Sequence, residues 1–167
     1  TGQAGNTLEV TDNTSLYVRG TNNFPTGFGT VTLAETSYVR YDATANQTVY
    51  SGVTYGRLLV SNNTKTAAGN LDVNGHIYLY NTVTFNLATY DHTFAGNIYN
   101  WDETWGRGSI TASGGTVTLD AADANQTIYY AGTGTYTFNN LTLTQTAPTA
   151  LRYKRFQNDI EVDGDFT

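Results

Sequence analysis

Residues 29–33 read Gly-Thr-Val-Thr-Leu, and residues 115–119 read the same five amino acids again. Downstream of each copy lies a second shared segment, Ala-Asn-Gln-Thr-Val-Tyr at residues 45–50 and Ala-Asn-Gln-Thr-Ile-Tyr at residues 124–129. These segments contain β-branched residues in an alternating pattern, which is typical of short strands. Two signatures in the same order indicate an internal repeat, and this repeat determines how the rest of the chain is interpreted.

A third pattern of apolar, acidic and glycine residues completes the repeat, at residues 71–77 and again at residues 160–166. The copies are 86 positions apart for the first pattern (29 to 115), 79 for the second (46 to 125) and 89 for the third (71 to 160). A constant order with variable spacing is typical of a solenoid, in which loops of different length interrupt a constant coil. We therefore divide the chain into approximate repeat units 29–114 and 115–167, the second incomplete. We expect both Ala-Asn-Gln-Thr segments to lie on a common side of the column.

The rest of the chain consists of short segments in which apolar and polar residues alternate, separated by turn clusters such as residues 21–23 and 113–115. Strand starts recur roughly every seven to ten residues, so that three strands per turn give coils of about 20–25 residues. This pattern predicts an all-β chain, a single solenoid over residues 1–167, folded as a right-handed parallel β-helix of about seven rungs. An antiparallel β-sandwich is the alternative, because it also has many short strands, but it does not need internal repetition.

A solenoid places particular residues inside or outside the column. The threonines of Gly-Thr-Val-Thr-Leu are expected on its outer face, where β-branching favours strand geometry. The asparagine of each Ala-Asn-Gln-Thr segment is expected at a bend, where its amide can bond along the column. Four tyrosines are expected to face outward: Tyr50, Tyr55, Tyr129 and Tyr130.

The composition limits the class of function. Charged residues make up 13% of the chain, and its formal net charge is −6. An acidic chain without a basic stripe is a poor match for nucleic acid or for an anionic membrane surface. The absence of cysteine excludes disulfides and thiolate metal sites, and no apolar run is long enough for membrane insertion. Low charge with abundant Thr, Asn and Tyr favours an extracellular location on a bacterial cell surface, and the start at Thr1 indicates a piece of a longer protein.

One copy of the repeat carries a combined motif through residues 115–119, 125–128 (Asn-Gln-Thr-Ile), 136–143 (Tyr-Thr-Phe-Asn-Asn-Leu-Thr-Leu) and 160–164 (Ile-Glu-Val-Asp-Gly). This motif resembles the repeats of very large secreted surface proteins of Bacteroidetes, among them the gliding-motility adhesins of flavobacteria. The likeness is weaker at residues 86–110. The resemblance implies a solenoid stalk exported by type IX secretion, with an adhesive or structural role and no catalytic residues.

Residues 97–109 break the repeat pattern and contain both tryptophans of the chain. Trp101 and Trp105 stand beside Asp102 and Arg107, a combination in which aromatic rings can stack on sugar rings while polar groups bind hydroxyls. We take these four residues as candidate carbohydrate-binding residues. The alternative is that the tryptophans fold back and cover the side of the column.

The carboxylates form no pair whose spacing indicates a catalytic site, so no catalytic residue is assigned. Asp159, Asp163 and Asp165 could begin a Ca²⁺ site, although calcium takes about six oxygen ligands. No other cofactor is expected. The histidines His76 and His92 lack the spacing of a transition-metal site.

These observations predict a non-enzymatic structural or adhesive repeat module of an extracellular surface protein. Its expected partners are flanking repeats of the same chain, other copies end to end, and surface glycans. The alternatives are a carbohydrate-binding or carbohydrate-active β-helix domain, and a self-assembling subunit of a surface filament or layer.

Overall fold

The computed structural model describes residues 5–100, 108–122, 124–129, 134–145, 152–157 and 159–167. These residues form twenty short strands, and they contain no helix that could span a membrane. In chain order the strands are β1 (Thr7–Val10), β2 (Ser15–Val18), β3 (Thr30–Leu33), β4 (Tyr38–Tyr41), β5 (Gln47–Val49), β6 (Thr54–Tyr55), β7 (Arg57–Ser61), β8 (Thr64–Ala67), β9 (Asp72–Val73), β10 (Ile77–Tyr80), β11 (Thr84–Ala88), β12 (His92–Phe94), β13 (Ile98–Asn100), β14 (Ser109–Ala112), β15 (Thr116–Leu119), β16 (Gln126–Tyr129), β17 (Tyr136–Phe138), β18 (Asn140–Leu143), β19 (Lys154–Phe156) and β20 (Glu161–Val162).

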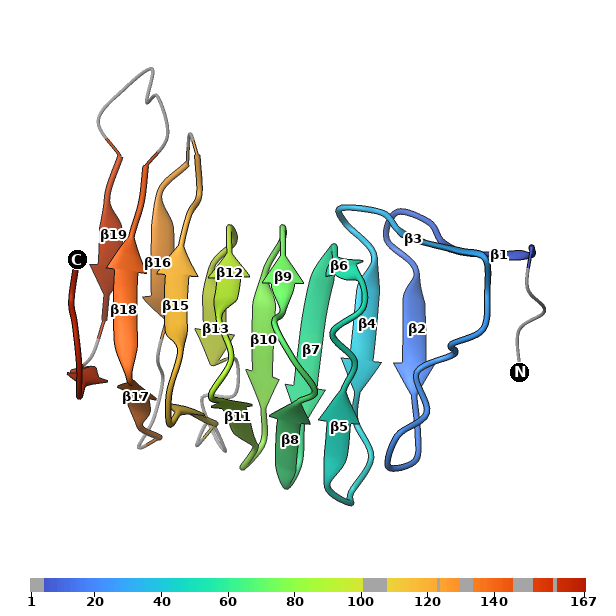
Figure 1. Ribbon diagram of the computed structural model, residues 1–167, viewed down its shortest axis with the longest axis horizontal. Coiled ribbons are helices and arrows are strands. Elements are labelled where there is room, and N and C mark those ends of the chain that lie inside the picture. Colours follow the sequence, from blue (N-terminus) through green and yellow to red (C-terminus); the bar gives the residue numbers. More distant parts are fainter. Residues whose placement is uncertain (1–4, 101–107, 123, 130–133, 146–151, 158) are drawn as a thin grey trace.

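The strands wind as successive coils into a column, with the two chain ends at its opposite ends (Figure 1). Three parallel sheets form its sides. Sheet I holds β2, β4, β7, β10, β13, β16 and β19; sheet II holds β5, β8, β11, β14, β17 and β20; sheet III holds β6, β9, β12, β15 and β18. Each coil passes through sheet III, sheet I and sheet II in turn. The predicted parallel β-helix is therefore confirmed, with about six turns, and the antiparallel sandwich is not the fold.

Side chains at matching positions of successive coils stack in rows inside the column. In sheet I, Val39, Leu58, Ile77, Ile98 and Ile128 follow one another in register, and each is at most 3% exposed. Burying an aliphatic side chain of this size contributes roughly 1.5–3 kcal/mol. Such rows fix the register of the coils, because a slip by one residue would turn the apolar side chains outward.

The two Gly-Thr-Val-Thr-Leu copies form β3 and β15, each of which precedes a strand of sheet I, but only β15 belongs to sheet III. In β15, Val117 and Leu119 are buried while the two threonines lie on the outer side, as predicted. Backbone conformation and close packing explain the glycine that precedes β15. Gly115 lies at φ 65°, and a Cβ there would meet the backbone carbonyl of Tyr90 in the preceding coil.

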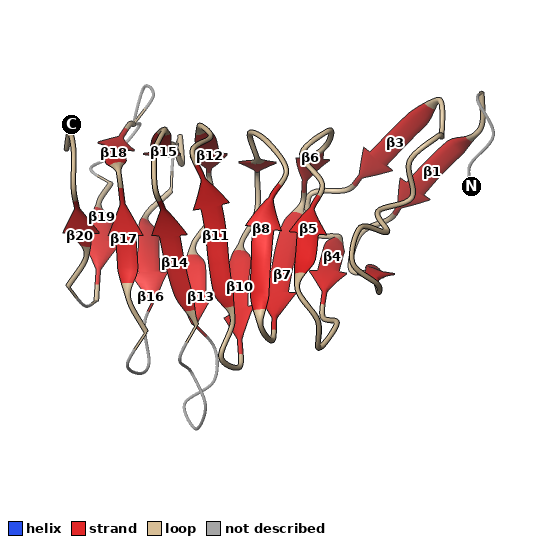
Figure 2. Cartoon of the chain, turned by 60° about the horizontal axis from the view of Figure 1, so that its bottom comes forward, coloured by secondary structure: helices blue, strands red, loops and turns tan. Residues whose placement is uncertain are grey.

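The first coil departs from the others. β1 and β3 pair only with each other, and they stand away from the rest of the column (Figure 2). Residues 19–29 occupy the place where a strand of sheet II would precede β5. Phe24 in this segment joins the buried core. Its ring stacks on Tyr50 with centroids 4.7 Å apart and meets Tyr55 edge-on at 6.5 Å.

The two Ala-Asn-Gln-Thr segments do not lie on a common side of the column, so that prediction was wrong. The segment in β5 belongs to sheet II, whereas the one in β16 belongs to sheet I. The third pattern is split in the same way, between β9 in sheet III and β20 in sheet II. These patterns therefore mark a local geometry that recurs at different places around the coil.

Candidate functional site

The Ala-Asn-Gln-Thr segments form corners between two sheets. The first corner turns the chain from sheet I into sheet II, and the second turns it from sheet III into sheet I. In the first corner, Gln47 Nε2 donates to the carbonyl oxygens of Val18 (2.7 Å) and Gly20 (2.8 Å) one coil earlier. Gln47 Oε1 accepts from the Ala43 N–H at 3.0 Å. The side chain is buried, so one amide satisfies three backbone groups, of which the Val18 carbonyl is buried and the other two are part-buried.

The second corner repeats this arrangement. Gln126 Nε2 donates to the carbonyl oxygens of Phe94 (2.6 Å) and Gly96 (2.8 Å), and its Oε1 accepts from the Ala121 N–H at 3.4 Å. Phe94 ends β12 as Val18 ends β2, so each glutamine holds the chain just beyond a strand of the preceding coil. The same side chain thus performs the same task at two different corners.

The asparagine before each glutamine bonds forward to the next coil. Asn46 Oδ1 accepts from the Thr64 N–H, and Asn125 Oδ1 accepts from the Tyr153 N–H, both at 3.2 Å. The predicted bend with an amide bonding along the column is thereby confirmed. Each corner is bonded backward by glutamine and forward by asparagine.

A lysine stands on each glutamine in the following coil, and the chain has only these two lysines, Lys65 and Lys154. Lys65 is fully buried, and its Nζ donates to the carbonyl oxygens of Ala43 and Ala45 at 2.8 Å each. Lys154 Nζ donates to Gln126 Oε1 at 2.7 Å. The lysines therefore bond corner groups of the coil below rather than facing solvent.

An aspartate precedes each corner and lies near the lysine. Asp42 Oδ1 and Asp120 Oδ1 are buried without a hydrogen-bond partner among the described residues. Burial lowers the pKa of Lys65 to about 8, and the charge of Asp42 opposes this shift. At the second corner, burial raises the pKa of Asp120 and lowers the pKa of Lys154, while each charge opposes the other's shift. The corners thus place opposite charges together inside the column.

The outer side of sheet I carries a continuous set of tyrosines and arginines. We call it the tyrosine–arginine face and define it by Tyr17, Tyr38, Arg40, Arg57, Tyr78, Tyr99 and Tyr129. Its tyrosine rings contact one another from coil to coil. The ring centroids of Tyr78 and Tyr99 are 5.3 Å apart, and those of Tyr99 and Tyr129 are 4.7 Å apart with planes inclined by 9°. The three rings are half-buried, and the Tyr99 hydroxyl accepts from Asn97 Nδ2 at 2.9 Å.

The arginines of this face lie against the tyrosine rings. The Arg40 guanidinium is 5.4 Å from the Tyr17 ring centroid and 5.2 Å from that of Tyr38, and Arg40 Nε donates to Ser15 Oγ at 3.1 Å. Arg57 lies 5.0 Å from the Tyr38 ring, and its Nη1 donates to Tyr38 Oη at 2.7 Å. Cation–π contacts of this kind hold a guanidinium in a fixed orientation.

The sequence-based site residues have mixed outcomes. Trp101, Asp102, Trp105 and Arg107 lie outside the described residues, as does Tyr130. Tyr129 faces outward as expected, and Tyr50 is half-buried against Phe24.

The expectation for Tyr55 was wrong. Its side chain is fully buried, because its hydroxyl donates to the Tyr50 carbonyl oxygen inside the column and lies 3.0 Å from the hydroxyl of Tyr41. Burial raises the pKa of both Tyr41 and Tyr55. An internal acceptor for the hydroxyl is what permits a tyrosine there, and residue spacing alone does not reveal such an acceptor.

The candidate calcium ligands Asp159, Asp163 and Asp165 are exposed around β20. Within the described ranges, no three His, Asp or Glu side chains come together as a metal site would require. The two histidines have structural partners instead. His92 Nδ1 accepts from the Leu71 N–H at 3.1 Å, and His76 Nδ1 accepts from the Asn97 N–H at 3.0 Å.

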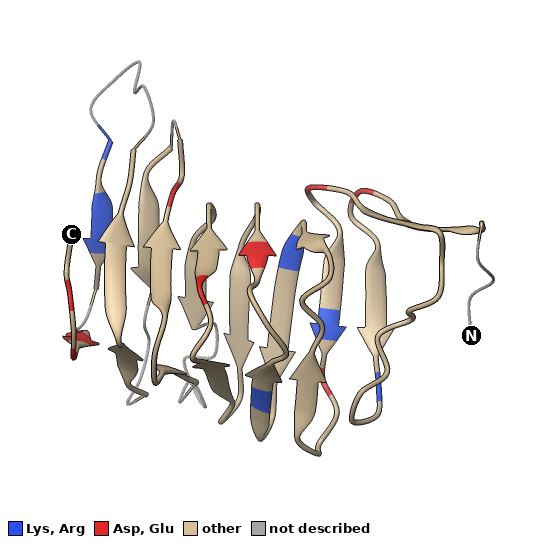
Figure 3. Cartoon of the chain, in the orientation of Figure 1, with Lys and Arg blue, Asp and Glu red and all other residues tan. Residues whose placement is uncertain are grey.

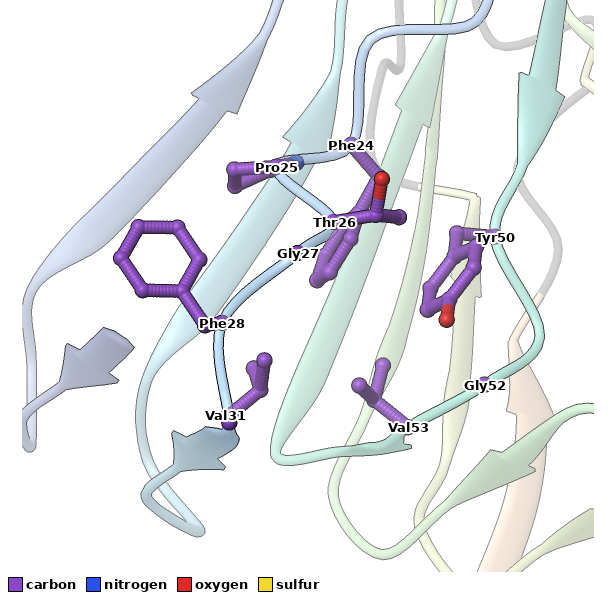
Figure 4. A pocket seen from close by; sticks show the side chains of 10 residues that line it. Phe24, Pro25, Thr26, Gly27, Phe28, Val31, Tyr50, Gly52 and Val53 are labelled. Carbon is purple, nitrogen blue, oxygen red and sulfur yellow. The ribbon is translucent and has the colours of Figure 1, made fainter. Parts of the chain in front are cut away.

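A cavity of about 240 Å³ opens where β3 leaves the column (Figure 4). Phe24 and Pro25 line it on one side, and Tyr50 and Val53 on the other. None of its ten lining residues is charged. Such a lining offers no charged side chain for acid–base chemistry.

Comparison of the chain with protein-family models, curated proteins and solved structures found no match.

Proposed function

We propose that this chain is a non-enzymatic structural and adhesive module of an extracellular bacterial surface protein, in which the stacked coils supply length and stiffness. The observation that supports this most is the in-register column itself, whose coils are joined by parallel ladders on three sides. The corner glutamines and lysines add bonds between coils that the ladders do not provide. A column of this kind extends by about 4.8 Å per coil, so added coils give reach in proportion.

The proposal assigns no catalytic role to the module. The two most buried carboxylates, Asp42 and Asp120, lie beside lysines at the interior corners. The remaining carboxylates in the described ranges lie in turns and on the outer sides of β1, β9 and β20. The resemblance to type IX-secreted adhesins points in the same direction and supports a cell-surface location, with a role in gliding motility included in the proposal.

The ends of the sheets suggest the partners. β19 and β20 are the last strands of sheets I and II in the described column, whereas residues 165–167 pair with the outer edge of β18 in sheet III. An uncovered strand edge pairs readily with another strand. We propose that flanking repeats or further copies of the chain stack there. The same edges are the basis of the alternative in which the module assembles into a surface filament or layer.

Carbohydrate binding is the second candidate function, and the tyrosine–arginine face is the observation that favours it. Tyrosine hydroxyls and guanidinium groups are suitable partners for sugar hydroxyl and acidic groups. In this alternative the column would act as a glycan-binding platform rather than only as a spacer.

Single-molecule force measurement tests the leading proposal. The chain is placed between two marker domains of known unfolding force and pulled from its ends. A mechanical module is expected to resist extension and to yield in discrete steps, and Gln47→Glu is expected to lower its unfolding force while the outward Thr66→Ser leaves it unchanged. Extension at forces no higher than those of an unstructured linker would contradict the proposal.

A further inference from the structure

Within the described strands, every arginine belongs to sheet I. No strand of sheet I contains Asp or Glu, although the whole chain carries a net charge of −6. Arg40 in β4, Arg57 in β7 and Arg155 in β19 all belong to this sheet (Figure 3). The strands of the other two sheets contribute Asp72, Glu161 and the buried Lys65. The outer side of sheet I therefore differs in charge from the rest of the surface.

Arg40 and Arg57 have no acidic partner among the described residues. The ion pair found there joins Arg19 to Asp42, at 3.8 Å. Arg40 and Arg57 instead contact tyrosine rings, Ser15 Oγ and Tyr38 Oη. A guanidinium has five N–H donors in a planar fork, so each of these arginines keeps donors for an anionic group. Because the rings already fix their orientation, binding costs little further ordering.

The neighbouring tyrosines continue this face along the column. Tyr17, Arg40, Leu59, Tyr78, Tyr99 and Tyr129 form one row, with one residue from each successive strand. Strands in a sheet are about 4.8 Å apart, so the row is straight and repeats at that interval. The outward edge of an aromatic ring is its positive part. The row therefore combines tyrosine hydroxyl groups with one cationic group, Arg40. Arg57 adds a second cationic group beside the row, in register with Tyr38.

We propose that the tyrosine–arginine face binds a linear acidic polysaccharide that lies along the column axis. Its carboxylates bind Arg40 and Arg57, and its hydroxyl groups contact the edges and hydroxyls of Tyr78, Tyr99 and Tyr129. This inference rests on the adhesive role proposed above, because it names the ligand that such an adhesive module would hold. The face matches sparse charge on a polyol chain better than nucleic acid, whose phosphates follow at about one charge per 1.7 Å of duplex and demand a dense basic surface.

The binding test uses the whole chain and three probes: polygalacturonate, its methyl ester, and single-stranded DNA. We expect polygalacturonate to bind, with a dissociation constant that rises with added salt, and the uncharged methyl ester to bind at least about tenfold more weakly, because charge-assisted bonds are the stronger ones. The double variant Arg40→Gln/Arg57→Gln is expected to lose about tenfold or more in affinity for polygalacturonate. The variant Arg40→Lys/Arg57→Lys keeps the charge and is expected to lose less.

Two controls separate this face from the rest of the surface. Arg155→Gln removes one positive charge from the far end of sheet I, and Thr66→Gln changes the outer side of sheet II; both are expected to retain binding within about twofold. Equal binding of the acidic polymer and its ester, unchanged affinity in the double variant with an unchanged melting temperature, or tighter binding to DNA would each overturn the inference. The force measurement above is independent of these outcomes, so the mechanical role could stand while this ligand is rejected.

Discussion

The corners at Gln47 and Gln126 share a sequence but stand at different places around the coil. At the first, the chain passes from sheet I to sheet II, and at the second from sheet III to sheet I. In both, a buried amide holds two carbonyl groups of the preceding coil and one N–H of its own, and a lysine of the next coil lies on the glutamine. The comparison shows that Ala-Asn-Gln-Thr encodes a way of turning the chain, and that it can be used at more than one corner.

The two corners also differ in tightness. In the first, the amide oxygen of Gln47 accepts from Ala43 at 3.0 Å, and Lys65 above it is fully buried. In the second, the corresponding distance from Gln126 to Ala121 is 3.4 Å, and Lys154 is half-buried. The second turn is one residue longer, because four residues separate Asp42 from Gln47 and five separate Asp120 from Gln126. We therefore expect the first corner to contribute more to stability.

Loss of a corner glutamine should have the largest effect. Gln47→Ala leaves the buried Val18 carbonyl, and the part-buried Gly20 carbonyl and Ala43 N–H, without their partner. We expect the free energy of unfolding to fall by about 2–4 kcal/mol, since each unsatisfied buried group costs about 1–3 kcal/mol. Urea denaturation measures this change in the free energy of unfolding.

Two further substitutions sharpen that result. Gln47→Glu keeps the acceptor but turns a carboxylate oxygen toward two carbonyls, so it should destabilise at least as much as alanine does. Gln126→Ala should cost somewhat less than Gln47→Ala, because the second corner is looser. Equal stability of the wild type and both alanine variants would show that the corners are held by other contacts.

Removal of the lysines should have an intermediate effect. Lys65→Met keeps an unbranched side chain of similar length but deletes two part-buried bonds to backbone carbonyls, and we expect a loss of about 1–3 kcal/mol. Lys154→Met should cost about 1 kcal/mol or less, because that lysine is less buried. Thermal unfolding monitored by circular dichroism compares the pair, and a larger loss for Lys154→Met would reverse the ranking of the corners.

The smallest expected effect is a pH dependence due to Lys65. Its pKa is about 8 in the folded state, and an unfolded lysine titrates near about 10.4. Between these values the unfolded chain binds more protons, so the contribution of this group to stability increases as pH rises from about 8 toward 10. Asp42 is the charged group that opposes the shift.

Tyrosine ionisation sets the upper end of the pH range in which the effect of Lys65 on stability can be measured. Burial raises the pKa of Tyr41 to about 12, so the folded state loses stability as pH rises above about 10, where unfolded tyrosine ionises. Urea unfolding at several pH values from about 7 to 9.5 isolates the lysine. Lys65→Met should flatten the rise, and an identical slope in wild type and variant would show that another group is responsible.

The fold could be predicted because short alternating strands start roughly every seven to ten residues, which matches three strands per coil. The outward threonines of β15 followed from alternation alone. The placement of the glutamine segments did not, because a one-dimensional pattern does not distinguish a strand on a given side from the corner that leads into a strand.

The sequence pattern also did not predict the tyrosine–arginine face, although all of its residues are present in the sequence. Arg40 lies opposite Tyr17 in one strand and Leu59 in the next, from positions 17, 40 and 59. These intervals of 23 and 19 residues (17 to 40, 40 to 59) are unequal, because the turns differ in length. The outer row can be identified only after the strands of every coil have been aligned. The contacts between its tyrosine rings and guanidinium groups then follow from the strand register.

Engineered disulfides test most directly whether the two glutamine segments belong to different sheets. The chain has no cysteine, so any disulfide within the chain must join the two introduced cysteines. We predict that Tyr99→Cys/Tyr129→Cys forms a disulfide in high yield, because these residues face each other in neighbouring strands of sheet I and parallel strands lie within disulfide reach. Thr111→Cys/Tyr129→Cys should stay reduced, because Thr111 lies in sheet II. Efficient crosslinking of the second pair, with none of the first, would place both glutamine segments on one side and contradict the assignment of the corners.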